Sequence, residues 1–290
     1  MVSDDVHNLI NQINELAKDQ YWDRLQRNIG TLSFEEQKNL KENIKIAVLG
    51  TGGLGAPLAT NLVYLGCRDL VLLDHDTIER SNLNRQMPFT EEDIGKHKVD
   101  VLASFLKKID PDVKIKKYYE ANEENIEEIL EGVNIAALTL DGPIGSILVA
   151  RKTRELGIPL VETLAVPYLL AWWFTKDSAD YETCLNLKTH NMTIAELRNS
   201  KDFTSNFREG LKQRMMKLPG LQEFYSREKG SMEALFSGQI APRSNSVVVL
   251  MASMNLALEI LFAGILKIKP QILAPKLVGY DYLQMKLISF

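Results

Sequence analysis

The sequence has 290 residues, of which 45% are hydrophobic and 25% are charged, so the chain is long enough to bury a substantial core. Its 34 basic and 38 acidic side chains give a formal net charge of -4, which disfavours binding to nucleic acid or to an anionic membrane through overall charge. The two cysteines, Cys67 and Cys184, are too few for a four-cysteine zinc site or a disulfide-rich secreted scaffold. We therefore expect a cytoplasmic protein without zinc.

The N-terminal segment, residues 1–43, has the pattern of a helical arm. Acidic residues follow Ser3, without the basic and then apolar order of a secretory leader, so no leader is expected. Ser33 and Glu36 have the spacing of a capping box for a second helix, which is predicted to end near Glu42. A first helix is predicted from apolar residues that recur every three or four positions, namely Val6, Leu9, Ile10, Ile13 and Leu16.

Residues 44–175 alternate between short apolar runs and longer amphipathic segments. A glycine-rich turn, residues 50–55, follows the first apolar run and opens the first of the helices. Such alternation requires crossover connections, so we predict a doubly wound, Rossmann-like α/β fold with a mostly parallel sheet and helices on both faces. Strands are expected over 44–49, 70–73, 113–118, 135–140, 159–163 and 172–174, and further helices over 95–109, 122–130 and 144–156.

The pattern changes in the last third of the chain. Residues 176–246 consist of short, charged helical pieces, which are typical of a lid or a crossover segment. Residues 247–266 are apolar enough to cross a membrane, but an acid at mid-membrane costs about 2.5–3.5 kcal/mol. Asn255 and Glu259 within this run therefore favour a buried helix and no membrane partner. Residues 276–288 predict two short strands, and we expect residues 1–290 to form one domain.

The turn Gly50-Thr51-Gly52-Gly53-Leu54-Gly55 lies where a Rossmann-like fold binds phosphate. Its glycines allow close approach of the backbone, and the N-terminus of the following helix supplies amide donors and a positive dipole end. Asp74, 24 residues after Gly50, closes the second strand and is placed to bind ribose hydroxyls. These features alone suit NAD, FAD, SAM or ATP, and they also suit glycines that only permit tight helix packing.

A polar, cationic loop after Asp74 favours a triphosphate over a dinucleotide. The run from Asp74 to Gln86 carries Asp76, Asn82 and Arg85, and Lys98 follows soon after. A triphosphate has more charge to neutralise than a pyrophosphate, and an arginine fork with a lysine point charge suits that task. Asp141 follows the strand expected over 135–140, at the sheet edge where ligands bind, and a carboxylate there can hold Mg²⁺ beside phosphate oxygens.

In this order and at this spacing, these residues resemble the nucleotide site of the ThiF/MoeB/HesA and ubiquitin-activating-enzyme superfamily. The specific part of the resemblance is the run Ser-Asn-Leu-Asn-Arg-Gln over 81–86, together with Lys98 and Asp141. It extends upstream to Arg27-Asn28-Ile29-Gly30, and more loosely downstream to Ala241-Pro242 and Tyr280-Asp281. The chain resembles the branch that lacks the four zinc-binding cysteines.

The resemblance implies a single ThiF-type adenylation domain over 1–290, divided into an arm (1–43), a core (44–175), a crossover or lid (176–246) and a C-terminal part (247–290). It implies that ATP and Mg²⁺ activate the C-terminal carboxylate of a ubiquitin-like protein, a sulfur-carrier protein or a peptide as an acyl-adenylate. By resemblance, the nucleotide-binding residues are Gly50, Gly52, Gly53, Gly55, Asp74, Asp76, Asn82, Arg85, Gln86 and Lys98, and the catalytic residues are Arg85, Lys98, Asp141 and Arg27.

The resemblance also implies a homodimer. Asp141 would hold the metal, and Arg27 would reach across the dimer to the γ-phosphate, with Arg24 as the alternative for that role. A thioester step would need a cysteine nucleophile, and we interpret Cys184 as an ordinary half-buried thiol. Two other functions are kept open: a non-catalytic partner subunit, which would tend to lose the arginine, lysine or aspartate, and an NAD- or FAD-dependent oxidoreductase, which would not need Arg85 or Lys98.

Overall fold

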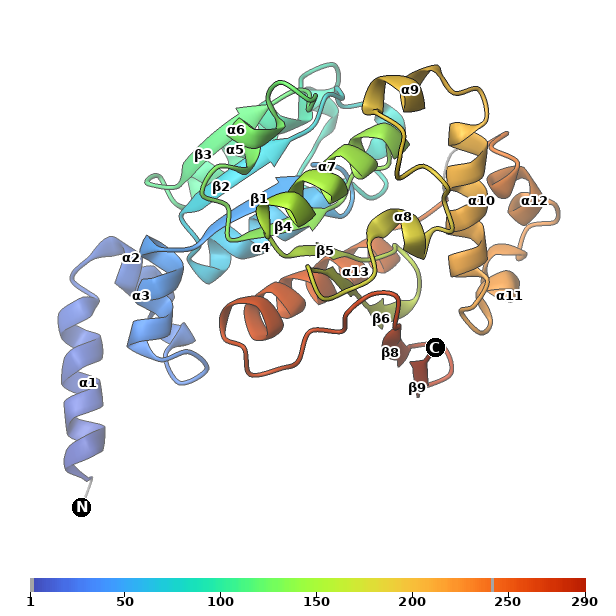
Figure 1. Ribbon diagram of the computed structural model, residues 1–290. Coiled ribbons are helices and arrows are strands. Elements are labelled where there is room, and N and C mark those ends of the chain that lie inside the picture. The colour runs from blue at the N-terminus through green and yellow to red at the C-terminus, as the bar shows by residue number, and fades with distance from the viewer. Residues whose placement is uncertain (1–2, 241–242) are drawn as a thin grey trace.

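A six-stranded sheet forms the centre of the computed structural model, which describes residues 3–240 and 243–290 (Figure 1). The strand order is β3-β2-β1-β4-β5-β7, in which the first five strands are parallel and β7 is antiparallel. The prediction of a doubly wound, mostly parallel α/β fold is confirmed. The strands are β1 (Lys45–Leu49), β2 (Asp69–Leu73), β3 (Lys114–Tyr118), β4 (Ile135–Leu138), β5 (Leu160–Glu162) and β7 (Trp172–Phe174).

Helices cover both faces of this sheet. Alternate residues of β1 enter different cores: Ala47 and Leu49 lie in one hydrophobic cluster, and Ile46 and Val48 lie in the other. The first cluster is covered by α6 (Ile126–Leu130) and α7 (Pro143–Leu156), and the second by α4 (Gly55–Leu65), α5 (Lys98–Ile109) and α13 (Ser246–Leu258). The inner strands β1, β2 and β4 are therefore largely apolar, because both of their faces are buried, whereas the edge strand β3 is mostly charged.

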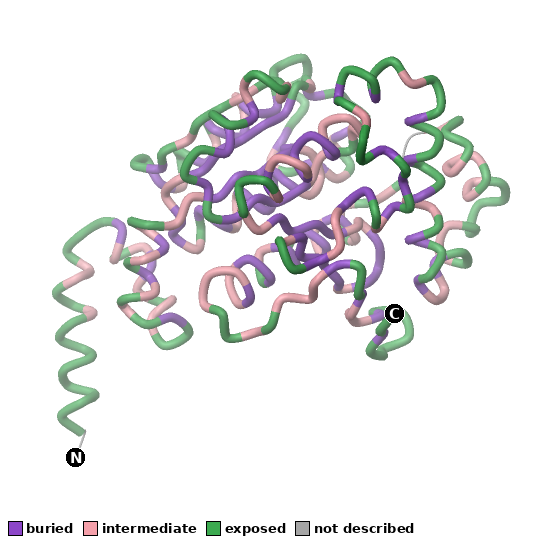
Figure 2. The backbone as a smooth tube through the Cα atoms, viewed as in Figure 1, coloured by how far each residue is buried: buried purple, intermediate pink, exposed green. Residues whose placement is uncertain are grey.

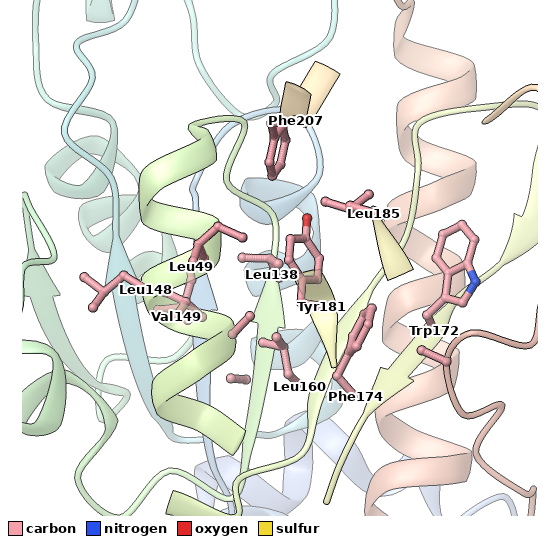
Figure 3. Close-up of a cluster of buried hydrophobic side chains, with 14 of the residues drawn as sticks. Leu49, Leu138, Leu148, Val149, Leu160, Trp172, Phe174, Tyr181, Leu185 and Phe207 are labelled. Carbon is pink, nitrogen blue, oxygen red and sulfur yellow. The ribbon is translucent and has the colours of Figure 1, made fainter. Parts of the chain in front are cut away.

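The first hydrophobic cluster joins the sheet to the crossover segment (Figure 3). Leu138 of β4 and Leu148 of α7 lie in the same cluster as Tyr181, Leu185 and Phe207, which belong to the crossover segment. Each large apolar side chain that is fully buried in this way stabilises the fold by about 1.5–3 kcal/mol. The crossover segment is thus anchored to the α7 face of the sheet.

The crossover segment consists of short helices, as predicted, and its described residues contain no strand. Many apolar residues of this segment are buried, so the segment packs against the core. The helices are α8 (Tyr181–Cys184), α9 (Ile194–Asn199), α10 (Phe203–Met215), α11 (Leu221–Tyr225) and α12 (Ser231–Phe236). Ala241-Pro242, part of the looser resemblance, lies outside the described residues.

The N-terminal arm is helical, and its second half is attached to the end of α4. The predicted capping box of Ser33 and Glu36 is present at the start of α3. The hydroxyl of Tyr21 donates a hydrogen bond to the Gly66 carbonyl oxygen at 2.9 Å. The helix α1 extends away from the body of the molecule and is mostly exposed (Figures 1 and 2). The arm comprises α1 (Asp4–Leu16), α2 (Gln20–Leu25), the 3-10 turn η1 (Gln26–Asn28) and α3 (Phe34–Glu42).

The long apolar helix near the C-terminus packs inside the protein. Among the described residues, Ser246–Ile265 is long and apolar enough to cross a membrane, and 44% of its most apolar stretch is buried. Asn255 donates a hydrogen bond to the Leu170 carbonyl oxygen at 2.9 Å, and Glu259 accepts one from the Trp173 indole at 3.1 Å. Both polar residues therefore have partners within the fold, as a core helix requires. Only the last part differs from the prediction, because Glu259–Ile265 is a π-helix, labelled η4 in chain order.

A small second sheet lies beside this helix. It has the order β6-β8-β9, with both pairs antiparallel, and comprises β6 (Tyr168–Leu170), β8 (Val278–Asp281) and β9 (Lys286–Ser289). The two C-terminal strands confirm the prediction for residues 276–288. The strand β6 was not predicted, because it is short and directly precedes β7.

Candidate active site

A cavity of about 620 Å³ opens at the carboxyl ends of the parallel strands. Its wall includes the turn after β1, residues 73–76 at the end of β2, residues 119–121 after β3 and residues 139–142 after β4. Strands β1 and β4 are neighbours, so the cavity lies at the point where the strand order reverses. Ligands of open α/β sheets bind at this position, and the cavity has the size of a small-molecule site.

The glycines of the turn have different surroundings. Gly50 has a φ of +106°, and a Cβ at this position would lie 2.4 Å from the Thr139 carbonyl oxygen. A Cβ on Gly55 would lie 1.7 Å from the Gly50 carbonyl oxygen, so Gly55 allows α4 to pack against β1. Gly55 does not line the cavity, whereas Gly50, Gly52 and Gly53 do. The role of Gly55 in this structure is therefore packing beneath the turn.

Asp74 holds the glycine turn in place from the end of β2. Its carboxylate is buried and accepts hydrogen bonds from the Thr51 amide at 2.7 Å and from the Thr51 hydroxyl at 3.2 Å. Its other oxygen accepts a bond from the Asp76 amide at 2.9 Å. Asp74 also lines the cavity. It thus links the β1 turn to the β2 loop, and its role toward a ribose stays a prediction.

Two predicted cations, Lys98 and Arg85, line the cavity. Lys98 begins α5 and is only 4% exposed, and its ammonium donates to the Asp76 carboxylate at 2.6 Å. Arg85 donates to the Ser81 carbonyl oxygen at 3.0 Å and to the Asn84 side chain at 2.8 Å. These partners orient both cations, and the arginine contacts use one of its nitrogens only. Positive charge is therefore present in the wall beside the glycine turn.

Asn82 and Gln86 differ in their relation to the cavity. Asn82 is buried, accepts a hydrogen bond from the Glu79 amide at 3.1 Å and does not line the cavity. Gln86 lines the cavity, and its side-chain oxygen is buried without a hydrogen-bond partner among the described residues. A buried oxygen without a hydrogen bond lowers the stability of the fold unless it accepts one from a bound ligand or a water molecule.

Asp141 lies just after β4, where it is exposed and lines the cavity. A carboxylate oxygen is a ligand that Mg²⁺ prefers, and this metal usually takes one or two carboxylates together with phosphate oxygens and water. The donor at Asp141 therefore fits a magnesium ion that arrives with a nucleotide.

Comparison with known proteins is decisive for the family. The model of the ThiF family matches residues 25–290. The chain belongs to the ThiF family. It is 34% identical over 118 residues to the SAMP-activating enzyme E1 of Haloferax volcanii, which covers 40% of this chain and 44% of that protein. It is also 34% identical over 154 residues to the adenylyltransferase and sulfurtransferase MOCS3 of Arabidopsis thaliana, covering 52% of this chain and 33% of that protein.

The chain spans less than half the length of these curated relatives. Among solved structures, E. coli MccB with ATP superposes with a TM-score of 0.59 at 20% identity, over 88% of this chain and 65% of that chain. PaaA superposes with a TM-score of 0.60 at 18% identity, over 100% of this chain and 84% of that chain. At these identities the structural likeness establishes the fold alone.

The two arginines proposed for the arm of this ThiF-family chain have different surroundings. Arg24 donates to the Asp110 carboxylate at 2.6 Å and to the Val63 carbonyl oxygen at 3.0 Å. Arg27 is exposed, and it has no side-chain hydrogen bond or ion pair within the described part of the chain. Neither residue lines the cavity. Arg24 is thus used to attach the arm, and Arg27 is available at the surface.

Several cavity residues of the ThiF-family site were missed by sequence reasoning. They come from distant segments: Ala165 precedes β6, Arg198 lies in α9, and Ser244 and Val249 lie around the start of α13. No local motif marks them, because their positions depend on how the crossover segment returns to the sheet.

Cys184 does not line the cavity of this ThiF-family chain. It lies at the end of α8 and is half-buried. Burial raises the pKa of the Cys184 thiol to about 11. A thiol with this pKa is protonated at neutral pH and is therefore a weak nucleophile.

Proposed function

We propose that the protein is an ATP-dependent adenylyltransferase. It activates the C-terminal carboxylate of a ubiquitin-like protein, a sulfur-carrier protein or a peptide as an acyl-adenylate and releases pyrophosphate. The observation that carries this proposal is the convergence of Arg85, Lys98 and Asp141, from three separate segments, on one glycine-lined cavity. The names of the relatives, activating enzymes and adenylyltransferases, support the same class of reaction.

The chemistry of this reaction is mainly charge neutralisation and positioning. An oxygen of the acceptor carboxylate attacks the α-phosphorus, and the bond from that phosphorus to the oxygen of the leaving pyrophosphate breaks. Arg85 and Lys98 would bind the phosphate oxygens, and Asp76 would orient the Lys98 ammonium through their 2.6 Å contact. Mg²⁺ bound at Asp141 would neutralise further charge on the phosphates. The attacking group is already an anion, so no general base is needed.

The position of the arm supports a homodimer in which Arg27 serves the partner's site. Neighbouring residues of the arm contact the C-terminal end of α4, where Asn28 donates to the Leu65 carbonyl oxygen at 3.2 Å. The cavity lies at the opposite end of this 11-residue helix, which is about 16 Å long. Arg27 is therefore held away from the cavity of its own chain, and a second copy would have to bring it to a nucleotide.

We favour adenylation without a thioester step, because Cys184 is a half-buried thiol with a raised pKa and does not line the cavity. A non-catalytic partner subunit is disfavoured since Arg85, Lys98 and Asp141 are all retained beside the cavity. An oxidoreductase would not require this set of charges.

ATP–pyrophosphate exchange tests the proposal. Purified protein is incubated with candidate acceptors that end in Gly-Gly, with ATP, Mg²⁺ and labelled pyrophosphate. Removing one preorganised donor typically costs about 2.7–4 kcal/mol of barrier, so Arg85→Ala and Asp141→Ala should each lower exchange by about 10²–10³-fold. Arg80→Ala is the matched control, because Arg80 is 78% exposed, pairs with Glu91 and lies outside the cavity wall.

Exchange that persists undiminished in Arg85→Ala and Asp141→Ala would reject the assignment of the site. Binding of NAD but not ATP would reject the function.

A further inference from the structure

The crossover segment contributes one cation, Arg198, to the wall of the nucleotide cavity. Arg198 lies in α9, which begins with a capping box formed by Thr193 and Glu196. Ile194 and Leu197 of this helix are buried in the same hydrophobic cluster as α7. These two side chains hold the helix against the hydrophobic cluster, and Arg198, which follows Leu197, lines the cavity.

In the part of the chain that the structure describes, no hydrogen bond uses the donors of the Arg198 side chain. Its guanidinium lies 3.9 Å from the Glu123 carboxylate, which is too long for a hydrogen bond. Within residues 3–240 and 243–290, it has no other side-chain partner. By contrast, Lys98 and Arg85 each have short contacts that orient them. Arg198 therefore presents a planar group with free donors to whatever occupies the cavity.

The location of Arg198 indicates which part of a nucleotide it would meet. In this fold, phosphates bind at the turn after β1 and the ribose at the end of β2. Strand β3 is the next neighbour of β2, so a base that continues in this direction would lie toward the end of β3. Residues 119–121, which follow β3, line the cavity, and Glu123 lies two residues beyond them. Because Arg198 lies close to Glu123, it would meet the adenosine end of a nucleotide in this cavity. Arg85, by contrast, lies beside the glycine turn.

We propose that Arg198 binds the adenine base of the nucleotide and is a specificity-determining residue of the crossover segment. A guanidinium stacks on the faces of aromatic rings, and a purine base offers such a face. The inference rests on the proposed use of ATP and adds to it a contact from outside the nucleotide-binding core.

Direct binding of three ligands separates the base from the phosphates. Titration calorimetry would measure Kd for ATP, AMP and tripolyphosphate with wild type, Arg198→Ala and Arg198→Lys. We expect Arg198→Ala to bind ATP and AMP about tenfold more weakly and tripolyphosphate with unchanged Kd. We expect Arg198→Lys to remain weak for ATP, because an ammonium lacks the planar surface. Arg227→Ala is the control, since Arg227 is an exposed arginine of the same segment outside the cavity.

An equal loss for tripolyphosphate would overturn the inference, because it would assign Arg198 to the phosphates. An unchanged Kd for ATP in Arg198→Ala would also overturn it while leaving the proposed function intact. Failure of the wild type to bind ATP would overturn both. Thermal unfolding of each variant checks the fold, and the Arg198 side chain, at 44% exposed, should be replaceable without a change in melting temperature.

Discussion

The glycines after β1 have different roles, because each is surrounded by different atoms. Gly55 has the Gly50 backbone where its side chain would be, so any larger residue must displace the chain. A Cβ on Gly52 would instead lie 3.5 Å from the side-chain amide nitrogen (Nε2) of Gln86, which is an ordinary van der Waals contact. Among the described neighbours a Cβ on Gly52 meets no close contact, and Gly52 borders the cavity on its other side.

This contrast predicts opposite results for two alanine variants. Gly55→Ala should lower the free energy of unfolding by about 3 kcal/mol or more, because backbone atoms must move. Gly52→Ala should unfold at nearly the wild-type temperature but bind ATP about tenfold more weakly, since the new methyl group narrows the approach of the phosphate to the backbone. Denaturant titration and calorimetry measure the two effects. Normal ATP binding by Gly52→Ala would contradict the placement of phosphate at this turn.

At the scale of elements, one buried arginine connects α10 to the main sheet. The Arg214 guanidinium lies 3.1 Å from the Glu162 carboxylate of β5 and 3.7 Å from the ring centroid of Trp172 in β7. Glu162 also accepts a hydrogen bond from the Tyr181 hydroxyl at 2.9 Å. Burial raises the pKa of Glu162, and the charge of Arg214 and these hydrogen bonds oppose that rise.

Replacing Arg214 alone should lower the free energy of unfolding more than replacing both Arg214 and Glu162. Arg214→Met leaves a buried carboxylate without its counter-charge, a change that costs about 3–5 kcal/mol of stability. The double variant Arg214→Met with Glu162→Gln should recover part of this loss. Both free energies of unfolding come from urea titration at pH 7. A double variant less stable than Arg214→Met would contradict this account.

The pH dependence of Arg214→Met gives a second check on the same pair. Without Arg214, burial raises the pKa of Glu162 further, and only the hydrogen bond from Tyr181 still opposes the rise. The folded form then holds its proton to higher pH than the unfolded chain does. The loss of stability should be absent below the ordinary pKa of glutamate, about 4.3, and should grow as the pH rises through the raised pKa. The deficit relative to wild type should therefore be smaller at pH 4 than at pH 7.

At the scale of the whole molecule, the arm and the cavity lie at opposite ends of α4. Figure 1 shows the arm at one side of the molecule and α9 at the other. The hydrogen bonds of Tyr21 and Asn28 to residues 65–66 fix the arm there. A single chain therefore does not bring Arg27 to the cavity that holds the other predicted catalytic residues, and under the proposed function a second copy would supply it.

Mixing two inactive variants tests this arrangement. Arg27→Ala and Arg85→Ala should each lose pyrophosphate exchange as homodimers. After refolding together in equal amounts, about half of the dimers are mixed and each has one intact site, so about a quarter of wild-type activity should return. Size-exclusion chromatography measures the oligomeric state of each sample. No recovery from mixed dimers would show that Arg27 does not act across an interface.

The fold class, the glycine turn and the main loops of the cavity follow from local residue patterns. Strand, turn and helix are encoded by residues a few positions apart, and the carboxyl ends of parallel strands necessarily meet at one edge. This is why Asp74, Arg85, Lys98 and Asp141 could be predicted to lie together, as the cavity wall has them.

Which distant residues reach that edge depends on the packing of the folded chain. Arg198 enters the cavity because Ile194 and Leu197 are buried beside α7, and no pattern near residue 198 records that packing. Likewise, Gly55 is excluded from the wall by the close packing of α4 on β1, and Arg27 is held at the far end of α4. Contacts between distant segments depend on the shapes of both surfaces, which a local spacing of residue types does not contain.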